Sequence, residues 1–218
     1  MGTFLDRRDA GRRLAERLLP FRDANPVVIA LPRGGAPVGD EIARALEAPL
    51  DILVARKLGA PGNPELAIGA IAPGVTHLEP GIIRALAVSE EYIRQAVAVE
   101  QQELRRREMR FREGRPALPV SGRTVILVDD GLATGATAVA AIESLRRQAP
   151  KAIVLAMPVG APEALQQLRQ LVDEVVCLEA PYFFRAVGQA YVDFRQTTDQ
   201  EVHDILRGRH MEVAAGEI

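Results

Sequence analysis

The chain has 218 residues, of which 48% are apolar and 26% charged, and its formal net charge is −2. This length favours one domain with a substantial core, and the composition excludes an intrinsically disordered chain. The small net charge provides no overall positive field, which argues against nucleic acid or a membrane surface as a partner.

The single cysteine, Cys177, excludes an intrachain disulfide and a cysteine-based zinc site. Residues 1–14 lack the apolar core of a signal peptide. No apolar run approaches the roughly 20 residues that span a bilayer. We therefore expect a soluble cytoplasmic protein.

The first half of the chain alternates between helix and strand patterns. Residues 10–19 carry Leu14 and Leu18 on one face, which predicts an amphipathic helix. The continuous apolar run 26–31 predicts a strand that is buried on both faces of a parallel sheet. The elements expected next are a turn from Pro32, a helix over 38–46, a strand over 50–55, a Gly/Pro-rich loop over 58–64 and a strand over 67–72.

The second half starts with the longest predicted helix, 89–112, which Ser89 can cap. Its apolar residues thin out toward Arg105, so we expect the second half of this helix to be exposed to solvent. The apolar run 124–128 predicts another buried strand, which ends at Asp129 and Asp130. Further helices are expected at 138–148, 162–172 and 198–206, and further strands at 152–156 and 175–178.

This alternation predicts an α/β fold with a doubly wound, mostly parallel sheet in a single domain, 1–218. We expect a helical insertion at about 84–115 and a C-terminal tail at about 180–218. In such sheets, ligands bind beyond the carboxyl ends of the strands. The strand ends expected to line one crevice are therefore 32–35, 56–57 and 129–130.

The most informative motif is VILVDDGLATGAT at 125–137, in which a buried strand leads into two carboxylates and a turn of small residues. The start of a helix offers unpaired N–H groups and a partial positive charge, and small residues let a phosphate approach. Adjacent carboxylates can accept hydrogen bonds from sugar hydroxyls or hold hydrated Mg²⁺. A strand end with a capped helix would explain one aspartate, but neither the pair nor the turn.

This segment resembles the signature of the type I phosphoribosyltransferases. The resemblance implies that Asp129 and Asp130 hold the ribose 2- and 3-hydroxyls of phosphoribosyl pyrophosphate, and Mg²⁺ directly or through water. It also implies that the turn cradles the 5-phosphate; its residues are Ala133, Thr134, Gly135, Ala136 and Thr137. Ala133 stands where the 6-oxopurine branch has an aspartate, which argues against a hypoxanthine or guanine acceptor.

The run Leu31-Pro32-Arg33-Gly34-Gly35 resembles the pyrophosphate loop of the same family. The resemblance implies a non-proline cis peptide between Pro32 and Arg33, and backbone N–H groups of Gly34 and Gly35 that face the pyrophosphate. Arg33 would add a charge-assisted hydrogen bond. By itself, such a run could also be only a tight turn.

Arg56 and Lys57 resemble the Arg-Lys pair that opens the mobile catalytic loop in the adenine and orotate branches. The resemblance implies that Arg56 contacts the pyrophosphate and that Lys57 is catalytic. The alternative is an ordinary surface loop. Together with a tail such as AVGQAYVDFRQTTDQEV, the motifs also resemble a bacterial group of predicted phosphoribosyltransferases of unassigned substrate.

Two weaker features lie outside these motifs. The arginine-rich run 105–115 is interrupted by glutamates, which favours a solvated helix over a lid on an anionic ligand or a nucleic-acid surface. The aromatic run Tyr182-Phe183-Phe184 could stack on a planar base from the small hood of the family, with Tyr182 and Phe183 as the candidates, or anchor the tail on the core. The three histidines show no metal-ligand spacing.

The resulting hypothesis is Mg²⁺-dependent transfer of a 5-phosphoribosyl group from phosphoribosyl pyrophosphate to a nitrogen acceptor, such as a nucleobase, with release of pyrophosphate. A non-catalytic sensor of phosphoribosyl pyrophosphate on the same fold is the alternative, and a sugar-phosphate hydrolase is a third reading. The partners expected are these small molecules, with no nucleic acid or membrane. The resemblance also implies a homodimer.

Overall fold

The structure is a computed structural model that describes residues 3–216, with side chains described up to Arg209. Its central sheet has five strands in the order β2-β1-β6-β7-β8, and every neighbouring pair is parallel. The strands are β1 Pro26–Ala30, β2 Leu50–Ile52, β6 Thr124–Val128, β7 Ala152–Val159 and β8 Glu174–Glu179. This arrangement confirms the α/β fold class expected from the sequence.

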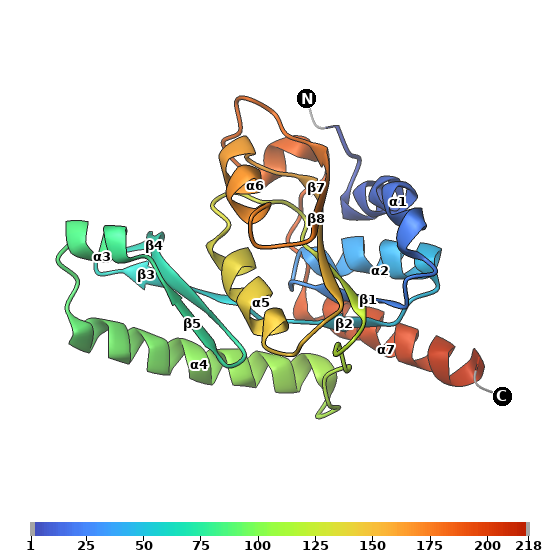
Figure 1. Ribbon diagram of the computed structural model, residues 1–218, viewed down its shortest axis with the longest axis horizontal. Coiled ribbons are helices and arrows are strands. Elements are labelled where there is room, and N and C mark those ends of the chain that lie inside the picture. The colour runs from blue at the N-terminus through green and yellow to red at the C-terminus, as the bar shows by residue number, and fades with distance from the viewer. Residues whose placement is uncertain (1–2, 217–218) are drawn as a thin grey trace.

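Side chains of the central strands alternate between two hydrophobic cores. Val28 and Ala30 of β1 face one core, whereas Val27 and Ile29 face the other. The first core is covered by α1 (Arg7–Leu18) and α2 (Gly35–Leu46), and the second by α5 (Ala136–Arg146) and α6 (Pro162–Leu168) (Figure 1). Because both faces of β1 and β6 are buried, their sequences are continuous apolar runs rather than alternating ones.

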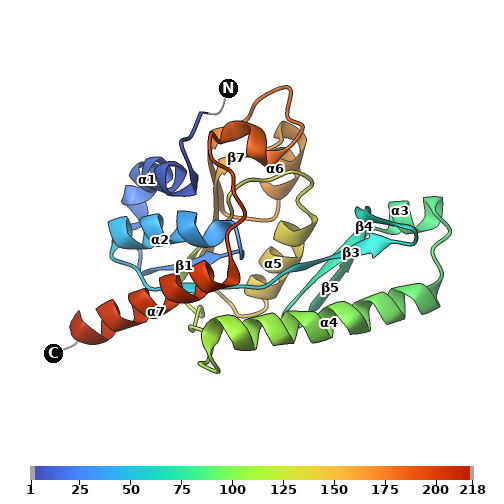
Figure 2. The same cartoon turned by 180° about the vertical axis from the view of Figure 1, so that it is seen from behind.

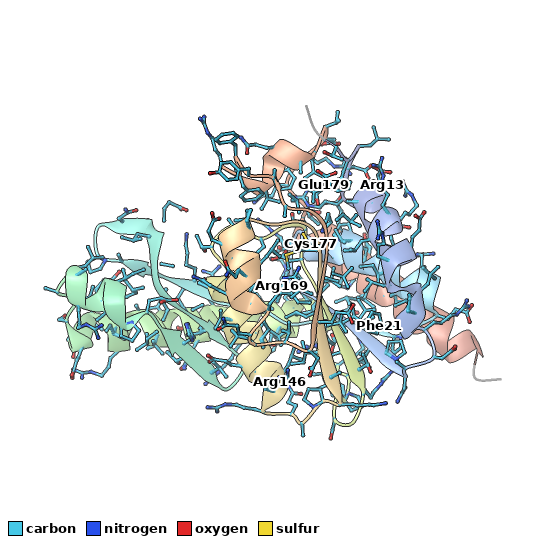
Figure 3. The ribbon with its side chains drawn as sticks, turned by 45° about the horizontal axis from the view of Figure 1, so that its top comes forward. Arg13, Phe21, Arg146, Arg169, Cys177 and Glu179 are labelled. Carbon is cyan, nitrogen blue, oxygen red and sulfur yellow. The ribbon has the colours of Figure 1, made fainter. Side chains whose placement is uncertain are left out.

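Figure 3 shows the two layers from above. Arg13 on α1 and Arg169 at the end of α6 lie on opposite sides of the sheet, whose edge strand carries Cys177 (Figure 3). Burial raises the pKa of the Cys177 thiol to about 11. The cysteine is therefore a partly buried sheet residue and not an activated thiol.

A second sheet corrects the prediction of a loop at 58–64. Strands β3 (Arg56–Ala60), β4 (Asn63–Ala72) and β5 (Val75–Leu78) form an antiparallel sheet, followed by α3 (Pro80–Ala85). Together with the first part of α4 (Glu90–Arg112) they form an arm beside the central sheet (Figure 1). Proline and glycine at 61–62 mark only the hairpin turn, and residues 58–60 and 63–64 pair as strands.

The arm is fixed to the main body where the turn between β4 and β5 meets α5. The Ser144 hydroxyl donates to the Pro73 carbonyl at 2.7 Å, and Arg147 Nη1 donates to the Gly74 carbonyl at 2.8 Å. These contacts hold the base of the hairpin. The segment in which the resemblance implied a mobile loop therefore forms a hairpin, and its movement stays a prediction.

Helix α4 begins as expected, because the Ser89 hydroxyl accepts a hydrogen bond from the Tyr92 N–H at 3.2 Å. Its second half is exposed along one face, as expected at Met109 and Arg110, but Leu104 and Phe111 are buried on the other. Arg112 at its end donates from Nε to the buried carboxylate of Asp51 at 3.0 Å. The helix therefore anchors the arm to strand β2.

The two ends of the described chain run beside each other. Phe4 pairs with Tyr191, and the Val192 N–H donates to the Phe4 carbonyl at 2.8 Å. The tail contains a short 3₁₀ helix at Val187–Ala190 and ends in α7 (Asp199–Gly216). Another short 3₁₀ helix, Leu19–Phe21, follows α1. Helix α7 packs on α2 and α4 (Figure 2) and extends beyond the end expected at 206.

Other element boundaries also differ from those expected from the sequence, and at α1 the reason is a side-chain cap. The Asp6 carboxylate accepts from the Asp9 N–H at 2.7 Å, so α1 begins at Arg7 and not at residue 10. Strand β7 continues to Val159 rather than ending at 156, while α6 ends at Leu168 rather than at 172. Among residues 3–216, no helix is long and apolar enough to cross a membrane.

Candidate functional site

The turn after β1 lies directly against the acidic pair after β6. Both turns continue from paired strands, since Ala30 of β1 is in register with Val128 of β6. A Cβ built on Gly34 would lie 2.0 Å from Oδ2 of Asp130, a distance that no side chain tolerates. A side chain at 34 would therefore displace the Asp130 carboxylate, and glycine permits the close approach of the backbone to it.

The peptide between Pro32 and Arg33 is cis, which confirms the non-proline cis bond expected at this position. The Leu31 N–H donates to the Val128 carbonyl at 2.8 Å, and the Gly35 N–H donates to the Leu31 carbonyl at 3.0 Å. These bonds tie the turn to the end of β6. Two of the three expected strand ends, 32–35 and 129–130, are therefore in contact.

The two aspartates have different surroundings. The pKa of Asp129 is raised well above its ordinary value, first by burial of the carboxyl and then by the charge of Asp130. Its Oδ1 accepts a hydrogen bond from the Asp130 N–H at 2.8 Å. The Asp130 side chain is 14% exposed and is paired with a guanidinium group. The pair thus places one desolvated carboxyl beside one ion-paired carboxylate.

The partner of Asp130 is Arg7, a residue that the sequence analysis did not select. Arg7 Nε donates to Oδ2 of Asp130 at 2.7 Å, and its Nη1 donates to the Arg195 carbonyl at 2.7 Å. Its guanidinium lies 4.0 Å from the centroid of the Phe194 ring. The hydroxyl of buried Tyr191 donates to the Asp130 carbonyl at 2.5 Å. Asp130 is therefore fixed in position jointly by α1, through Arg7, and by the tail, through Tyr191.

No signal in the sequence could have identified Arg7. It is one of several arginines in residues 7–13, and its partner Asp130 is 123 positions away. Tyr191 and Phe194 lay in an aromatic segment that had been noted only as part of the tail. Their role follows from pairing of the tail with residues 4–5, which local sequence does not encode.

The small-residue turn leads into α5 as expected. Gly135 has φ +83°, a left-handed conformation that favours glycine, and α5 begins at Ala136. Ala133 and Thr134 are exposed. Within the part of the chain that the structure describes, no side chain caps the start of α5. Its first N–H groups are therefore available to an anion such as a phosphate.

Arg33 points from the cis-peptide turn toward the start of α7. Its Nη1 lies 3.4 Å from Oδ1 of Asp199, and its side chain is 31% exposed. The other oxygen of Asp199, Oδ2, lies 2.8 Å from Nη1 of Arg110 on α4. Arg33 is thus partly accessible to solvent. It shares its partner Asp199 with Arg110, and neither of these two residues belongs to the recognised motifs.

Arg56 and Lys57 belong to strand β3, and their ion pairs lie on the arm. Arg56 donates from Nε to Oε2 of Glu100 on α4 at 2.7 Å, and Lys57 Nζ lies 3.1 Å from Oε2 of Glu65 on β4. Among the described residues, neither side chain forms a hydrogen bond or an ion pair with the turn at 32–35 or with the acidic pair. A role for either side chain at the pyrophosphate would require a change in these partners.

The exposed aromatic residues of the tail lie beyond β8. Tyr182 and Phe183 are 87% and 84% exposed, and their rings meet edge to face at 5.0 Å. This exposure contradicts a core-anchoring role for these two residues, whereas the neighbouring Phe184 is partly buried and does pack against the core beside Tyr191. Phe183 lines a cavity of about 280 Å³ with Glu179 and Gln189, so a planar group could be accommodated beside it.

The acidic pair is compatible with Mg²⁺ but cannot complete a metal site alone. Mg²⁺ is commonly held by one or two carboxylates together with water and substrate phosphate oxygens. Within the described residues, no group of three or more His, Cys, Asp or Glu side chains could hold a metal ion. Asp129, which faces the charge of Asp130 in a desolvated position, would gain from a cation. The donor set therefore fits a Mg²⁺ ion that arrives with its ligand.

The whole chain was compared with known proteins. Residues 5–195 match the family model described as "Phosphoribosyl transferase domain". Two Mycobacterium tuberculosis proteins with provisional names as phosphoribosyl transferases are 46% identical over 215 residues, which is 98% of this chain and 48% of each relative. The chain thus spans about half the length of these curated relatives.

Two further similarities concern a shorter segment and a solved structure. A uracil phosphoribosyltransferase from Clostridioides difficile is 43% identical over 56 residues, or 26% of this chain and 27% of that protein. The crystal structure of TT1426 from Thermus thermophilus has a TM-score of 0.80 and 45% identity, and covers 94% of this chain and 98% of that one.

Proposed function

The chain belongs to the phosphoribosyl transferase domain family, and we propose that it transfers a 5-phosphoribosyl group from phosphoribosyl pyrophosphate to a nitrogen acceptor in a Mg²⁺-dependent reaction. The acceptor in this proposal is a nucleobase, and the second product is pyrophosphate. The observation that carries the proposal is the contact between Gly34 and Asp130. It joins a turn suited to pyrophosphate to a carboxylate pair suited to ribose.

Each part of the substrate has a matching element. The open start of α5, from Gly135 onward, suits the 5-phosphate because its N–H groups are uncapped within the described chain. Asp129 and Asp130 suit the two ribose hydroxyls as acceptors. Arg33 and the backbone of the cis-peptide turn suit the pyrophosphate. The cis-peptide turn follows β1, and the acidic pair and the start of α5 both follow the neighbouring strand β6, which supports a single path for the substrate in this proposal.

In the proposed reaction, the bond between ribose C1 and the pyrophosphate oxygen breaks, and a bond forms between C1 and the acceptor nitrogen. The electron pair of the broken bond leaves with pyrophosphate, and the acceptor nitrogen loses a proton to solvent or to pyrophosphate. Such a substitution passes through an oxocarbenium-like state, as in glycoside chemistry. Mg²⁺ would neutralise charge on the leaving pyrophosphate.

The chain's own contribution to this reaction is mainly electrostatic. Asp130, fixed by Arg7 and Tyr191, presents a carboxylate close to where positive charge develops on ribose. Arg33 faces the departing negative charge. Tyr182 and Phe183 remain candidates for contact with the base, because they are exposed beside a cavity at the end of β8. We include a homodimer and a cytoplasmic location in the proposal as implications of the resemblance.

The main alternative is a non-catalytic sensor that binds phosphoribosyl pyrophosphate on the same site. It is supported by the partners of Arg56 and Lys57, which lie on the arm and not at the turn. A sensor would bind the ligand but release no pyrophosphate. A hydrolase would release it without any acceptor.

The test is pyrophosphate release from phosphoribosyl pyrophosphate with Mg²⁺, across a panel of nucleobases that includes uracil, adenine, hypoxanthine and orotate, with a control that lacks base. We expect release with one base, and loss of release in Asp130→Asn. Asp23→Asn is the matched control, because Asp23 is an exposed aspartate outside the site. Binding by calorimetry without release would favour the sensor, and release without base would favour the hydrolase.

A further inference from the structure

Asp199, the first residue of α7, bridges two arginines from different parts of the chain. Its Oδ1 lies 3.4 Å from Nη1 of Arg33, and its Oδ2 lies 2.8 Å from Nη1 of Arg110. Arg33 comes from the turn after β1, whereas Arg110 comes from the last turns of α4. One carboxylate thus uses both of its oxygens to hold two guanidinium groups, one of which comes from the cis-peptide turn.

The surrounding contacts fix this arrangement. Glu201 Oε2 accepts from the Thr198 N–H at 2.7 Å, which closes the start of α7. Nε2 of His203 lies 2.6 Å from Oε1 of Glu113, which joins α7 to the end of α4. These contacts do not involve Asp199 itself, so they hold α4 against α7 independently of its carboxylate.

The two arginines form an anion-binding site in which the Asp199 carboxylate is the bound anion. Two guanidinium groups repel each other unless an anion lies between them, and a carboxylate presents two oxygens much as a phosphate does. Asp199 and Arg33 are 24% and 31% exposed, and Arg110 is 58% exposed, so a solute can reach the bridge. A diphosphate carries more negative charge than a carboxylate and can satisfy both arginines.

A third guanidinium lies in the same field. Arg106 is one turn before Arg110 on α4, and its pKa is raised mainly by Glu103, with a smaller contribution from the charge of Asp199. Arg106 is paired with Glu103 at 2.7 Å, so Arg110 is the α4 guanidinium that Asp199 holds directly.

We propose that Arg110 is a further diphosphate-binding residue, and that the Asp199 carboxylate occupies the place of a phosphate oxygen until the ligand arrives. The inference rests on the proposed function, because Arg33 marks the pyrophosphate position. It assigns a role to α4, which the recognised motifs leave without one. Asp199 is then a competitor of the ligand and not a ligand contact.

This assignment predicts opposite effects for two substitutions at one ion pair. Asp199→Asn keeps the volume and one acceptor oxygen but removes the competing charge, so inorganic pyrophosphate should bind about five- to tenfold more tightly. Arg110→Gln should weaken binding about fivefold, because one charge-assisted contact is lost. Arg110→Lys should recover part of that loss, since lysine keeps the charge but not the planar geometry.

The measurement is calorimetric titration of the full chain with inorganic pyrophosphate in the presence of Mg²⁺. Asp204→Asn removes the same charge elsewhere on α7, and Arg105→Gln removes the same charge from the α4 face that carries Met109. Both controls should change the dissociation constant less than twofold. Thermal unfolding of every variant shows whether the fold is retained.

Two outcomes would overturn the inference in distinguishable ways. If the wild-type chain binds pyrophosphate but Asp199→Asn weakens binding or leaves it unchanged, Asp199 is a structural link and the inference fails alone. If a folded Arg110→Gln variant binds pyrophosphate as tightly as the wild-type chain, the inference also fails while the proposed function stands. If the folded wild-type chain binds neither pyrophosphate nor phosphoribosyl pyrophosphate, the proposed function fails and the inference with it.

Discussion

Replacement of Arg7 by methionine tests whether the first helix and the tail stabilise the acidic pair. The variant loses the 2.7 Å ion pair with Asp130, the 2.7 Å hydrogen bond to the Arg195 carbonyl and the contact at 4.0 Å with the Phe194 ring. Methionine keeps comparable volume and apolar character. The substitution therefore removes mainly the charge and the hydrogen bonds.

The magnitude follows from the burial of each contact. The side chains of Arg7 and Asp130 are 11% and 14% exposed, so their pair should contribute more than a surface ion pair, about 1–2 kcal/mol. The hydrogen bond and the ring contact should each contribute about 0.5–1 kcal/mol. We expect the free energy of unfolding to fall by about 3 kcal/mol, and Tm to fall by about 6–12 °C.

The assay is urea denaturation at pH 7, with a double-mutant cycle between Arg7→Met and Asp130→Asn. The coupling energy should be about 1.5 kcal/mol, because each single variant leaves a partner unpaired. Arg12→Met is the matched control, since Arg12 is 56% exposed and 3.8 Å from Glu41; it should cost less than about 0.5 kcal/mol. A coupling energy near zero, or a loss below about 1 kcal/mol in Arg7→Met, would refute this reasoning.

Three further predictions concern the site and the sheet. Gly34→Ala should abolish calorimetric pyrophosphate binding because its Cβ would meet Asp130 Oδ2, whereas Gly81→Ala, with open space around its Cβ and no left-handed backbone, should bind normally; equal binding would contradict the close approach. The pKa of Asp129 is raised, first by burial, so the folded chain favours the protonated carboxyl. The free energy of unfolding is therefore higher at low pH and falls as the pH rises and Asp129 ionises. Asp129→Asn should therefore raise the free energy of unfolding by about 1–2 kcal/mol at pH 7 but not near about pH 4, as urea titrations at both pH values would show; a loss at pH 7 would contradict it. Burial raises the pKa of Cys177 to about 11, so its alkylation at pH 8 should be at least about tenfold slower in the folded chain than in urea, and equal rates would argue against burial.

Local patterns were sufficient for the central sheet and for the two turns that form the site. The runs 26–31 and 124–128 are apolar at every position because both of their faces are buried, and such runs need no tertiary information to be identified. The cis peptide at Pro32–Arg33 and the turn before α5 were implied by resemblance on a few contiguous residues.

The arm shows where local patterns were insufficient. Gly59, Pro61, Gly62 and Pro64 gave the segment the composition of a loop, yet it forms a hairpin. Its strands are stabilised by contacts with α4 and α5, which lie later in the chain. The same long-range packing buries Leu104 and Phe111 in the second half of α4, although the sequence of this half is rich in charge.

The sequence by itself determined the α/β class, the positions of the buried strands and the two turns that meet at their ends, because each depends on residues that are adjacent in the chain. Tertiary structure alone decided that Arg7 pairs with Asp130, that Asp199 bridges Arg33 and Arg110, and that Arg56 and Lys57 are paired on the arm. An ion pair depends on which side chains folding brings within about 4 Å, and an arginine-rich sequence offers many possible partners for each carboxylate. Only the packing of α1, α4, α7 and the tail selects among them.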